Sequence, residues 1–416
     1  MSAQDPGVER LLAGARFTPL YEGWLPEREK LVAQWWKARS PGRSVEVLLV
    51  NATRGLQFYP AIVDFFLLLK SASPELGVTS ASYFEEIEEL HAGVSGRGLS
   101  VVRIPQMQSW SDADFGRFDL VIAIGPSPEL ARLMSIEGLK AKLVLLDCGF
   151  YHQMIEGVPS FLERQDTPAA RAAWAWPSGG QKNRGALYTC QPFEKVANDL
   201  GRHFALDKLA WRRLRYIPMG FGRRQYYRAD KQAFDVALLG TDGRDYSLLV
   251  PFFLKGKTFL FLGAIDRAPA IAKLKSQADV TVVSRVDEDE YAKLLAICRC
   301  VAMPLFRTTH NVFLSVVDAF AAGVPIVTSS CAGFEELQRE AAPIAFHHDR
   351  RRPYGGDSRA SLNVVSAALS LARHVREITT DDARRRSMSD QAVRYTKDRL
   401  DMYWILERIL EEQLPP

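Results

Sequence analysis

The stretch HNVFLSVVDAFAAGVPIVTSS, residues 310–330, decides how the second half of the chain is interpreted. An apolar segment that contains one acid, Asp318, is followed by Gly323, Pro325 and a run rich in β-branched residues. This order predicts a helix that ends at a glycine and leads into a buried strand. Burial of an unpaired carboxylate is costly, so Asp318 either binds a cation, backbone donors or ligand hydroxyls, or points to water.

Units of this kind, a short strand next to a longer amphipathic helix, recur through most of the chain. Runs rich in β-branched residues alternate with helical patterns, as in parallel sheets covered by helices. The predicted strands are 45–51, 99–104, 119–125, 142–149 and 186–190 in one series, and 234–240, 258–263, 279–284, 300–305 and 325–330 in another. The sequence therefore predicts an α/β protein with two doubly wound, Rossmann-like domains.

The domain boundaries follow from the segments around these two series. RYIPMGFGRR, residues 215–224, carries the Pro and Gly punctuation of a hinge, and residues 361–415 have the pattern of helices throughout. We expect four parts: a helical N-terminal extension, an N-terminal domain, a C-terminal domain and a C-terminal helix, over residues 1–44, 45–215, 216–390 and 391–416.

The composition is that of a folded, water-soluble protein. Of 416 residues, 47% are apolar and 25% are charged. The formal charge of +4 is too small to indicate nucleic-acid binding, although it is compatible with a small anionic ligand. The first residues do not resemble an export signal, and no apolar stretch of about 18 residues occurs. We expect a cytoplasmic protein without a membrane span.

The cysteines favour a reducing compartment. Their number, five, is odd, and most lie in apolar, strand-like contexts that suit reduced core thiols. Cys298 and Cys300 flank one arginine, which is a weak metal-binding pattern. Buried thiols are the preferred interpretation, and we expect no metal site.

Function is expected in the loops after the strands, because open α/β sheets bind ligands at the carboxyl ends of their strands. No GxGxxG motif follows a predicted strand and no Walker A motif occurs, so the dinucleotide and P-loop fingerprints are absent. Gly240 and Arg244 instead occupy the turn after residues 234–240, where a helix is expected to begin. Helix amides and an arginine fork can hold a diphosphate. An ordinary turn with a solvated arginine is the alternative.

A second phosphate site is expected where the helix of residues 310–330 begins. A Thr or Asn cap would direct the amides of Asn311, Val312 and Phe313 toward a ligand. Asp318 would lie about 9 to 12 Å further along the helix axis. That separation suits a diphosphate at the helix start and ribose hydroxyls at the acid.

Residues 279–338 resemble the nucleotide-binding half of retaining glycosyltransferases with the GT-B fold, of the glycosyl transferases group 1 type. That family typically has two acids separated by seven residues, then an alanine-rich helix, Gly-x-Pro, a strand and a Gly-x-x-Glu turn. Here Asp318 is the second acid, and AFAAGVP (319–325), the strand 325–330 and GFEE (333–336) follow in order. A weaker likeness extends over most of the chain.

The resemblance implies a nucleotide-sugar donor domain over 216–390 and an acceptor domain over 45–215, facing each other across a cleft. The C-terminal helix would pack back onto the acceptor domain. Arg54 and Gly55, after the first strand, would face the acceptor. The implied donor-binding residues are Gly240, Arg244, Ser284, Arg285, Val286, Asn311, Val312, Phe313 and Glu336.

The family's first acid has no counterpart, because His310 occupies its position eight residues before Asp318. An imidazole can form a hydrogen bond to the transferred sugar but cannot copy the charge of a carboxylate. His310 and Asp318 are the candidate catalytic residues. His152 is a third candidate near the reacting sugar, and a structural histidine is its alternative interpretation.

The expected activity is transfer of a sugar from a nucleotide-sugar to a glycan, lipid-linked or small-molecule acceptor, with retention of configuration. Neither a metal nor a separate cofactor is expected, since helix termini can replace a cation at the diphosphate. A non-catalytic sugar-nucleotide-binding scaffold in polysaccharide assembly, which His310 favours, and a GT-B-like sugar-nucleotide epimerase are the alternatives. The basic and aromatic run 211–228 is either a solvated hinge face or a surface that contacts anionic lipid, at the inner face of the membrane, or a charged glycan acceptor.

Overall fold

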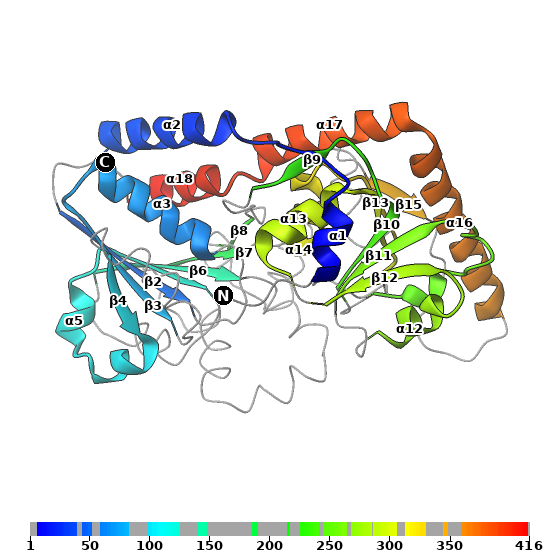
Figure 1. The fold of residues 1–416 in the computed structure, drawn as a ribbon. Coiled ribbons are helices and arrows are strands. Elements are labelled where there is room, and N and C mark those ends of the chain that lie inside the picture. Colours follow the sequence, from blue (N-terminus) through cyan, green and yellow to red (C-terminus); the bar gives the residue numbers. More distant parts are fainter. Residues whose placement is uncertain are drawn as a thin grey trace. The chain divides into compact units, whose positions relative to one another are not determined.

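The chain, described by a computed structural model, forms two compact units (Figure 1). We call Gly23–Arg223 with Asp401–Pro416 the N-terminal unit, and Met1–Glu22 with Arg224–Leu400 the C-terminal unit. The residues that the structure describes are 6–39, 44–51, 59–82, 99–124, 140–147, 185–189, 214–216, 225–240, 244–263, 268–284, 286–305, 313–329, 344–347 and 359–414.

The N-terminal unit is built on a parallel sheet with the strand order β4-β3-β2-β5-β6-β7-β8. Its central strand, Leu120–Ile124, is apolar and buried on both faces, as expected for a sheet covered on both sides. The strands are β2 (Val45–Asn51), β3 (Leu76–Ser82), β4 (Ser100–Arg103), β5 (Leu120–Ile124), β6 (Lys142–Asp147), β7 (Gly185–Thr189) and β8 (Leu214–Tyr216). All the predicted strands of the first series are confirmed, and β3 and β8 lie in the sheet in addition to them.

Helices from both chain segments of this unit pack together. α3 (Tyr59–Ala72) packs on β3, and both α2 (Trp24–Arg39) and α18 (Met402–Gln413) pack on α3. Arg28 of α2 forms ion pairs with Asp401, at 2.5 Å, and with Glu407. The C-terminal helix thus belongs to the unit that contains the first strand series. The shorter helices are the 3-10 helix Ile104–Ser109 and α5 (Asp112–Gly116).

The C-terminal unit has a second parallel sheet, in the order β12-β11-β10-β13-β14-β15. Val236 pairs with Cys300, and Val301 pairs with Ile326. The strands are β10 (Phe234–Leu239), β11 (Thr258–Leu262), β12 (Asp279–Val283), β13 (Cys298–Met303), β14 (Ile326–Ser329) and β15 (Ile344–His347). The second predicted series is confirmed, with β15 in addition.

A helical layer buries one face of this second sheet. Ala367, Leu371, Val375 and Ile378 recur at helical spacing along α16 and share one core cluster with the sheet residue Val236. The α-helices among the described residues of 224–400 are α12 (Pro269–Lys275), α13 (Glu288–Ala296), α14 (Phe313–Ala321), α16 (Arg359–Thr380) and α17 (Asp382–Arg399).

The predicted helical region 361–415 is confirmed as three helices with two breaks. Asp381 caps α17 by accepting a hydrogen bond from the Arg384 amide, and Asp401 caps α18 by accepting from the amides of Tyr403 and Trp404. The second break separates the two units, so α17 and α18 belong to different units.

The prediction of one N-terminal extension over residues 1–44 needs correction. α1 (Pro6–Leu12) contacts α13, and β1 (Phe17–Pro19) pairs antiparallel with β9 (Tyr227–Ala229). The buried Tyr21 hydroxyl donates to the Ala321 carbonyl at 2.8 Å. These contacts hold the first residues in the C-terminal unit, whereas α2 belongs to the N-terminal unit.

The ion pairs of Arg28 give a test of how α18 is held. We expect Arg28→Met to lower the free energy of unfolding by about 2 kcal/mol, because two buried carboxylates would lose their cation. Urea unfolding followed by tryptophan fluorescence measures the loss. Arg39→Met is the matched control on the same helix, since Arg39 lies 3.5 Å from the more exposed Glu411 and is expected to cost less than about 0.5 kcal/mol. Equal losses for the two variants would contradict this account.

Candidate active site

The candidate site lies in the C-terminal unit, at the carboxyl ends of β10 and β13. Gly240 follows β10 with a φ of 68°, a conformation that glycine adopts without strain. Beyond it, Arg244 forms an isolated antiparallel bridge with Leu305, and the Asp245 amide donates to the Pro304 carbonyl at 2.8 Å. The residues after β10 therefore cross to the end of β13.

Arg244 is fixed inside this site. The residue is 8% exposed, its Nε donates to the Leu239 carbonyl at 3.1 Å, and its Nη2 donates to Ser315 Oγ at 2.8 Å. Ser315 lies in the first turn of α14. The alternative of a solvated arginine is therefore wrong, and the cation is held beside the helix start that the sequence predicted as a phosphate site.

The predicted helix after Gly240 also needs correction. Only a 3-10 helix, η3 (Tyr246–Leu248), follows Arg244. The Tyr246 hydroxyl donates to the carbonyls of Leu239, at 3.1 Å, and Gly240, at 2.8 Å, and burial raises the pKa of this phenol. The described residues between Arg244 and η3 are thus held by side chains and do not form the start of an α-helix that could bind an anion. What this segment provides to the site is the Arg244 side chain.

Asp318 does not point to water. It lies on α14 with 7% exposure, and its Oδ1 accepts a hydrogen bond of 2.6 Å from the hydroxyl of Tyr226, which is 1% exposed. Tyr226 directly precedes β9, and nothing in the sequence pattern distinguishes it from the other aromatic residues of its run. The sequence thus marked the acid but missed its partner.

The structure brings only part of the predicted site together. Gly240, Arg244 and the start of α14, at Phe313, are collected around the end of β10, with Asp318 further along the same helix. Ser284, exposed, and Val286, half-buried, lie between β12 and α13. The predicted residues that lie outside the described ranges are Arg54, Gly55, His152, Arg285, His310, Asn311, Val312 and Glu336.

Two further sequence interpretations concern metals and membranes. Cys298 and Cys300 are buried free thiols, and burial raises the pKa of Cys300 to about 12, which keeps this thiol protonated. Within the described ranges, no group of three or more His, Cys, Asp or Glu residues could hold a metal ion. The helices of the same ranges include none with the length and apolar character needed to cross a membrane.

Comparison with a family model places this site in a known context. Residues 252–349 match the family described as Glycosyl transferases group 1. The matched segment is less than half of the chain, begins just after η3 and includes α14 with Asp318. No curated protein matches the chain in sequence.

Solved structures share the fold over most of the chain. Sucrose-phosphate synthase from Thermosynechococcus elongatus has a TM-score of 0.59 and 12% identity, over 89% of this chain and 99% of that one. WaaG, a glycosyltransferase involved in lipopolysaccharide biosynthesis, has a TM-score of 0.54 and 14% identity, over 89% and 100%. A putative UDP-N-acetylglucosamine 2-epimerase from Listeria monocytogenes has a TM-score of 0.50 and 12% identity, over 88% and 95%. The chain therefore has the GT-B fold with two Rossmann-like units, and the family match supports a glycosyltransferase.

Proposed function

We propose that the protein transfers a sugar from a nucleotide-sugar donor to a glycan, lipid-linked or small-molecule acceptor. One observation carries the proposal: the buried Arg244 is bonded to Ser315 in the first turn of α14, and Asp318 lies three residues further along the same helix. The rise between Ser315 and Asp318 is about 4.5 Å. A fixed cation followed by a fixed carboxylate suits a diphosphate followed by a ribose.

In this proposal Arg244 stabilises the departing diphosphate. A guanidinium that is already oriented in a buried site costs no reorganisation when negative charge develops on the leaving group. The free amides at the start of α14, beginning with Phe313, add a partial positive charge on the same side. This arrangement would need no metal ion, in line with the expected metal independence.

Asp318 is proposed to accept hydrogen bonds from the ribose hydroxyls. A carboxylate offers roughly four acceptor positions on its two oxygens. The Tyr226 hydroxyl occupies one position on Oδ1 and orients the group. Tyr226 is then a positioning residue, because it would act on the nucleotide only through Asp318.

The remaining roles follow the family resemblance. Ser284, Arg285 and Val286 would contact the base, and Glu336 would contact the donor. His310 and His152 would contact the transferred sugar, and Arg54 with Gly55 would face the acceptor. Transfer with retention of configuration, a hexosyl group, a cytoplasmic location and a peripheral membrane contact are part of the same proposal.

Two other functions are each compatible with a specific observation. His310 in place of the family's first acid favours a sugar-nucleotide-binding scaffold without turnover. The likeness to a putative epimerase shows that the fold alone does not select a transferase. The match of residues 252–349 to Glycosyl transferases group 1 favours transfer over both.

A panel of UDP-, GDP- and ADP-sugars separates the three functions. We expect one donor to be hydrolysed slowly, or transferred to an added acceptor, at a rate that a chelator does not change. Mass spectrometry of the products is the measurement. Binding without turnover would favour the scaffold, and recovery of an isomerised nucleotide-sugar would favour the epimerase.

Asp318→Asn with Tyr226→Phe as its matched partner tests the ribose contact. Tyr226→Phe removes the hydrogen bond to Asp318, whereas Asp318→Asn keeps an acceptor oxygen and removes the charge, and each is expected to lower the free energy of unfolding by about 1 to 2 kcal/mol. Asp318→Asn alone removes the carboxylate, so it should weaken binding of the nucleoside diphosphate by at least about tenfold. Calorimetry gives the affinity. An equal loss of affinity in both variants would reduce Asp318 to a structural role.

Arg244→Gln and Ser315→Ala test the diphosphate contact. We expect Arg244→Gln to lower kcat by about 100-fold, because it removes a preorganised charge from the leaving group. Ser315→Ala leaves the charge of Arg244 in place and removes only one of the hydrogen bonds that hold this side chain. We therefore expect kcat to fall by less than about tenfold in Ser315→Ala. Steady-state kinetics with the donor found in the panel measures both, and unchanged kcat in Arg244→Gln would contradict the role.

A further inference from the structure

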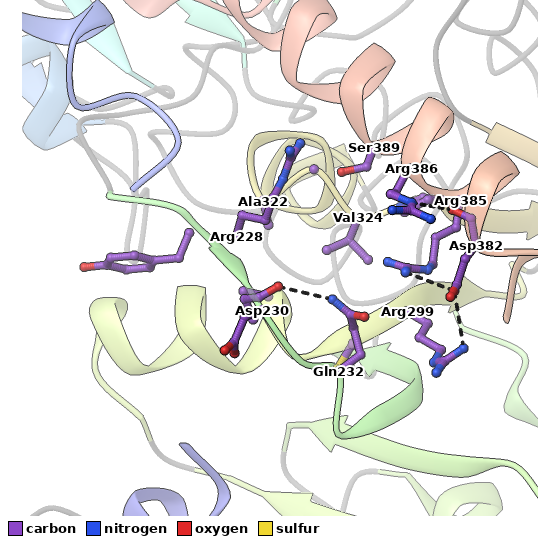
Figure 2. A pocket seen from close by; sticks show the side chains of 16 residues that line it. Arg228, Asp230, Gln232, Arg299, Ala322, Val324, Asp382, Arg385, Arg386 and Ser389 are labelled. Carbon is purple, nitrogen blue, oxygen red and sulfur yellow. Dashed lines mark hydrogen bonds and ion pairs between the residues drawn. The ribbon is translucent and has the colours of Figure 1, made fainter. Parts of the chain in front are cut away.

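A cavity lies at the opposite edge of the same sheet, lined by Arg299, Arg385 and Arg386 among others (Figure 2). It has a volume of about 330 Å³ and is bordered by the amino ends of β13 and β14, through Cys298 and Pro325. Gly240 and Arg244 lie beyond the carboxyl ends of the strands, so the cavity is separate from the candidate donor site. Its volume is at the small end of the range for ligand pockets, roughly 300 to 1,000 Å³.

Arginines dominate the polar lining of this cavity. Four arginines and two aspartates give a formal excess of two positive charges, from Arg228, Arg299, Arg385, Arg386, Asp230 and Asp382. The aspartates are partly engaged: the backbone amide of Arg16 donates to Asp230 at 2.8 Å. A concave site with several guanidinium groups is suited to a compact anion with several oxygens.

Arg385 has an unmet donor in this cavity. Its side chain is 14% exposed, and its Nη2 donates to Asp382 Oδ1 at 3.1 Å. Its Nε is buried and finds no hydrogen-bond partner among the described residues. Buried polar groups in proteins are nearly always paired, so a buried guanidinium N–H without a partner is unusual, and Arg385 is a lining cation whose hydrogen-bonding capacity the described residues do not fill.

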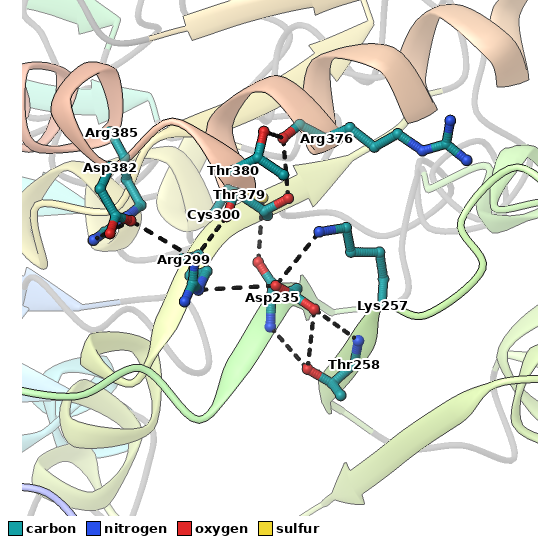
Figure 3. A network of polar contacts seen from close by, with 10 residues as sticks. All are labelled: Asp235, Lys257, Thr258, Arg299, Cys300, Arg376, Thr379, Thr380, Asp382 and Arg385. Atoms are coloured by element: carbon teal, nitrogen blue, oxygen red, sulfur yellow. Dashed lines mark hydrogen bonds and ion pairs between the residues drawn. The ribbon is translucent and has the colours of Figure 1, made fainter.

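Arg299 is held rigidly at the same wall. Its Nη1 donates to the Thr379 carbonyl at 2.6 Å, and its Nε lies 3.8 Å from Asp235 Oδ1 (Figure 3). The same aspartate lies 3.7 Å from Lys257 Nζ and accepts from the Thr258 amide at 3.1 Å. Arg299 is therefore a preorganised cation, which lowers the entropy lost when it binds an anion.

The two arginines already converge on one carboxylate. Asp382 Oδ1 lies 3.1 Å from Arg385 Nη2 and 3.7 Å from Arg299 Nη1. The hydrogen bond from Arg385 lowers the pKa of Asp382, so this exposed acid is ionised. Asp382 is also the first residue of α17, where the helix dipole favours negative charge. The wall thus already holds one oxyanion between two arginines.

We propose that this cavity binds a small soluble phosphomonoester. A phosphate group supplies the oxygens that guanidinium groups bind in pairs, and the remaining volume accepts a small polar body. At the rim Arg228 is 54% exposed and its ion-pair partner Asp390 is 58% exposed, so this guanidinium is accessible to a ligand. No step of the proposed sugar transfer uses this site.

Calorimetry on the full chain with inorganic phosphate and with glycerol phosphate tests the proposal. We expect saturable binding of one ester per chain, weakened at least about tenfold in Arg385→Gln and in Arg386→Gln. Glycerol itself should not bind. The Tm of each variant shows whether it is folded. Because Arg385→Gln and Arg386→Gln are tested separately, the test remains valid if one of them does not fold.

Arg384→Gln is the matched control, because Arg384 is on the same helix but donates to Glu377 and does not line the cavity. Arg384→Gln should change the affinity for the ester by less than about twofold. If it weakened binding as much as Arg385→Gln does, the ester would be held by diffuse surface charge, and the proposal would be overturned. Arg244→Gln should retain ester binding, which separates this site from the donor site. Binding to phosphatidate vesicles without binding of the soluble esters would also overturn the proposal.

Discussion

The parallel pairing of β10 with β13, and of β13 with β14, is the constraint on which both sites of the C-terminal unit depend. Because these strands run in one direction, Gly240 and Leu305 meet at one edge of the sheet, and Cys298 and Pro325 meet at the other. The carboxyl edge receives Arg244 and the amino edge receives the start of α17. The pairing register of β10, β13 and β14 thus fixes two separate charged sites, one at each edge of the sheet.

The contact between Tyr226 and Asp318 shows how the N-terminal residues of the chain support the first site. Tyr226 precedes β9, which pairs with β1, and the Leu20 amide donates to the Tyr226 carbonyl at 2.9 Å. Tyr21 in turn bonds to Ala321 at the end of α14. Two tyrosines therefore fix both the acid and the last turn of its helix, which explains why a carboxylate is tolerated there: it is buried with a donor.

The sequence predicted what depends on local pattern. Strands rich in Val, Ile and Leu were found, whereas LGVTSAS (Leu76–Ser82) was missed because small and hydroxyl residues give no strand signal until neighbouring strands bury them. A helix was expected to begin in the turn after Gly240, but the Tyr246 hydroxyl and the Arg244–Leu305 bridge, which depend on the fold, hold these residues otherwise. The arginine cavity draws on segments far apart in the chain, so no local pattern could reveal it.

Helix α14 connects the two edges. Its first turn carries Ser315, the partner of Arg244, and its last residues lead into Ala322, which lines the cavity and whose amide donates to the Asp318 carbonyl at 2.9 Å. Nine residues span only about 13.5 Å, so residues of both sites lie on or directly after one short helix. The placement of α14 on the sheet therefore sets the position of Ser315 and Asp318 in the first site and of Ala322 in the second.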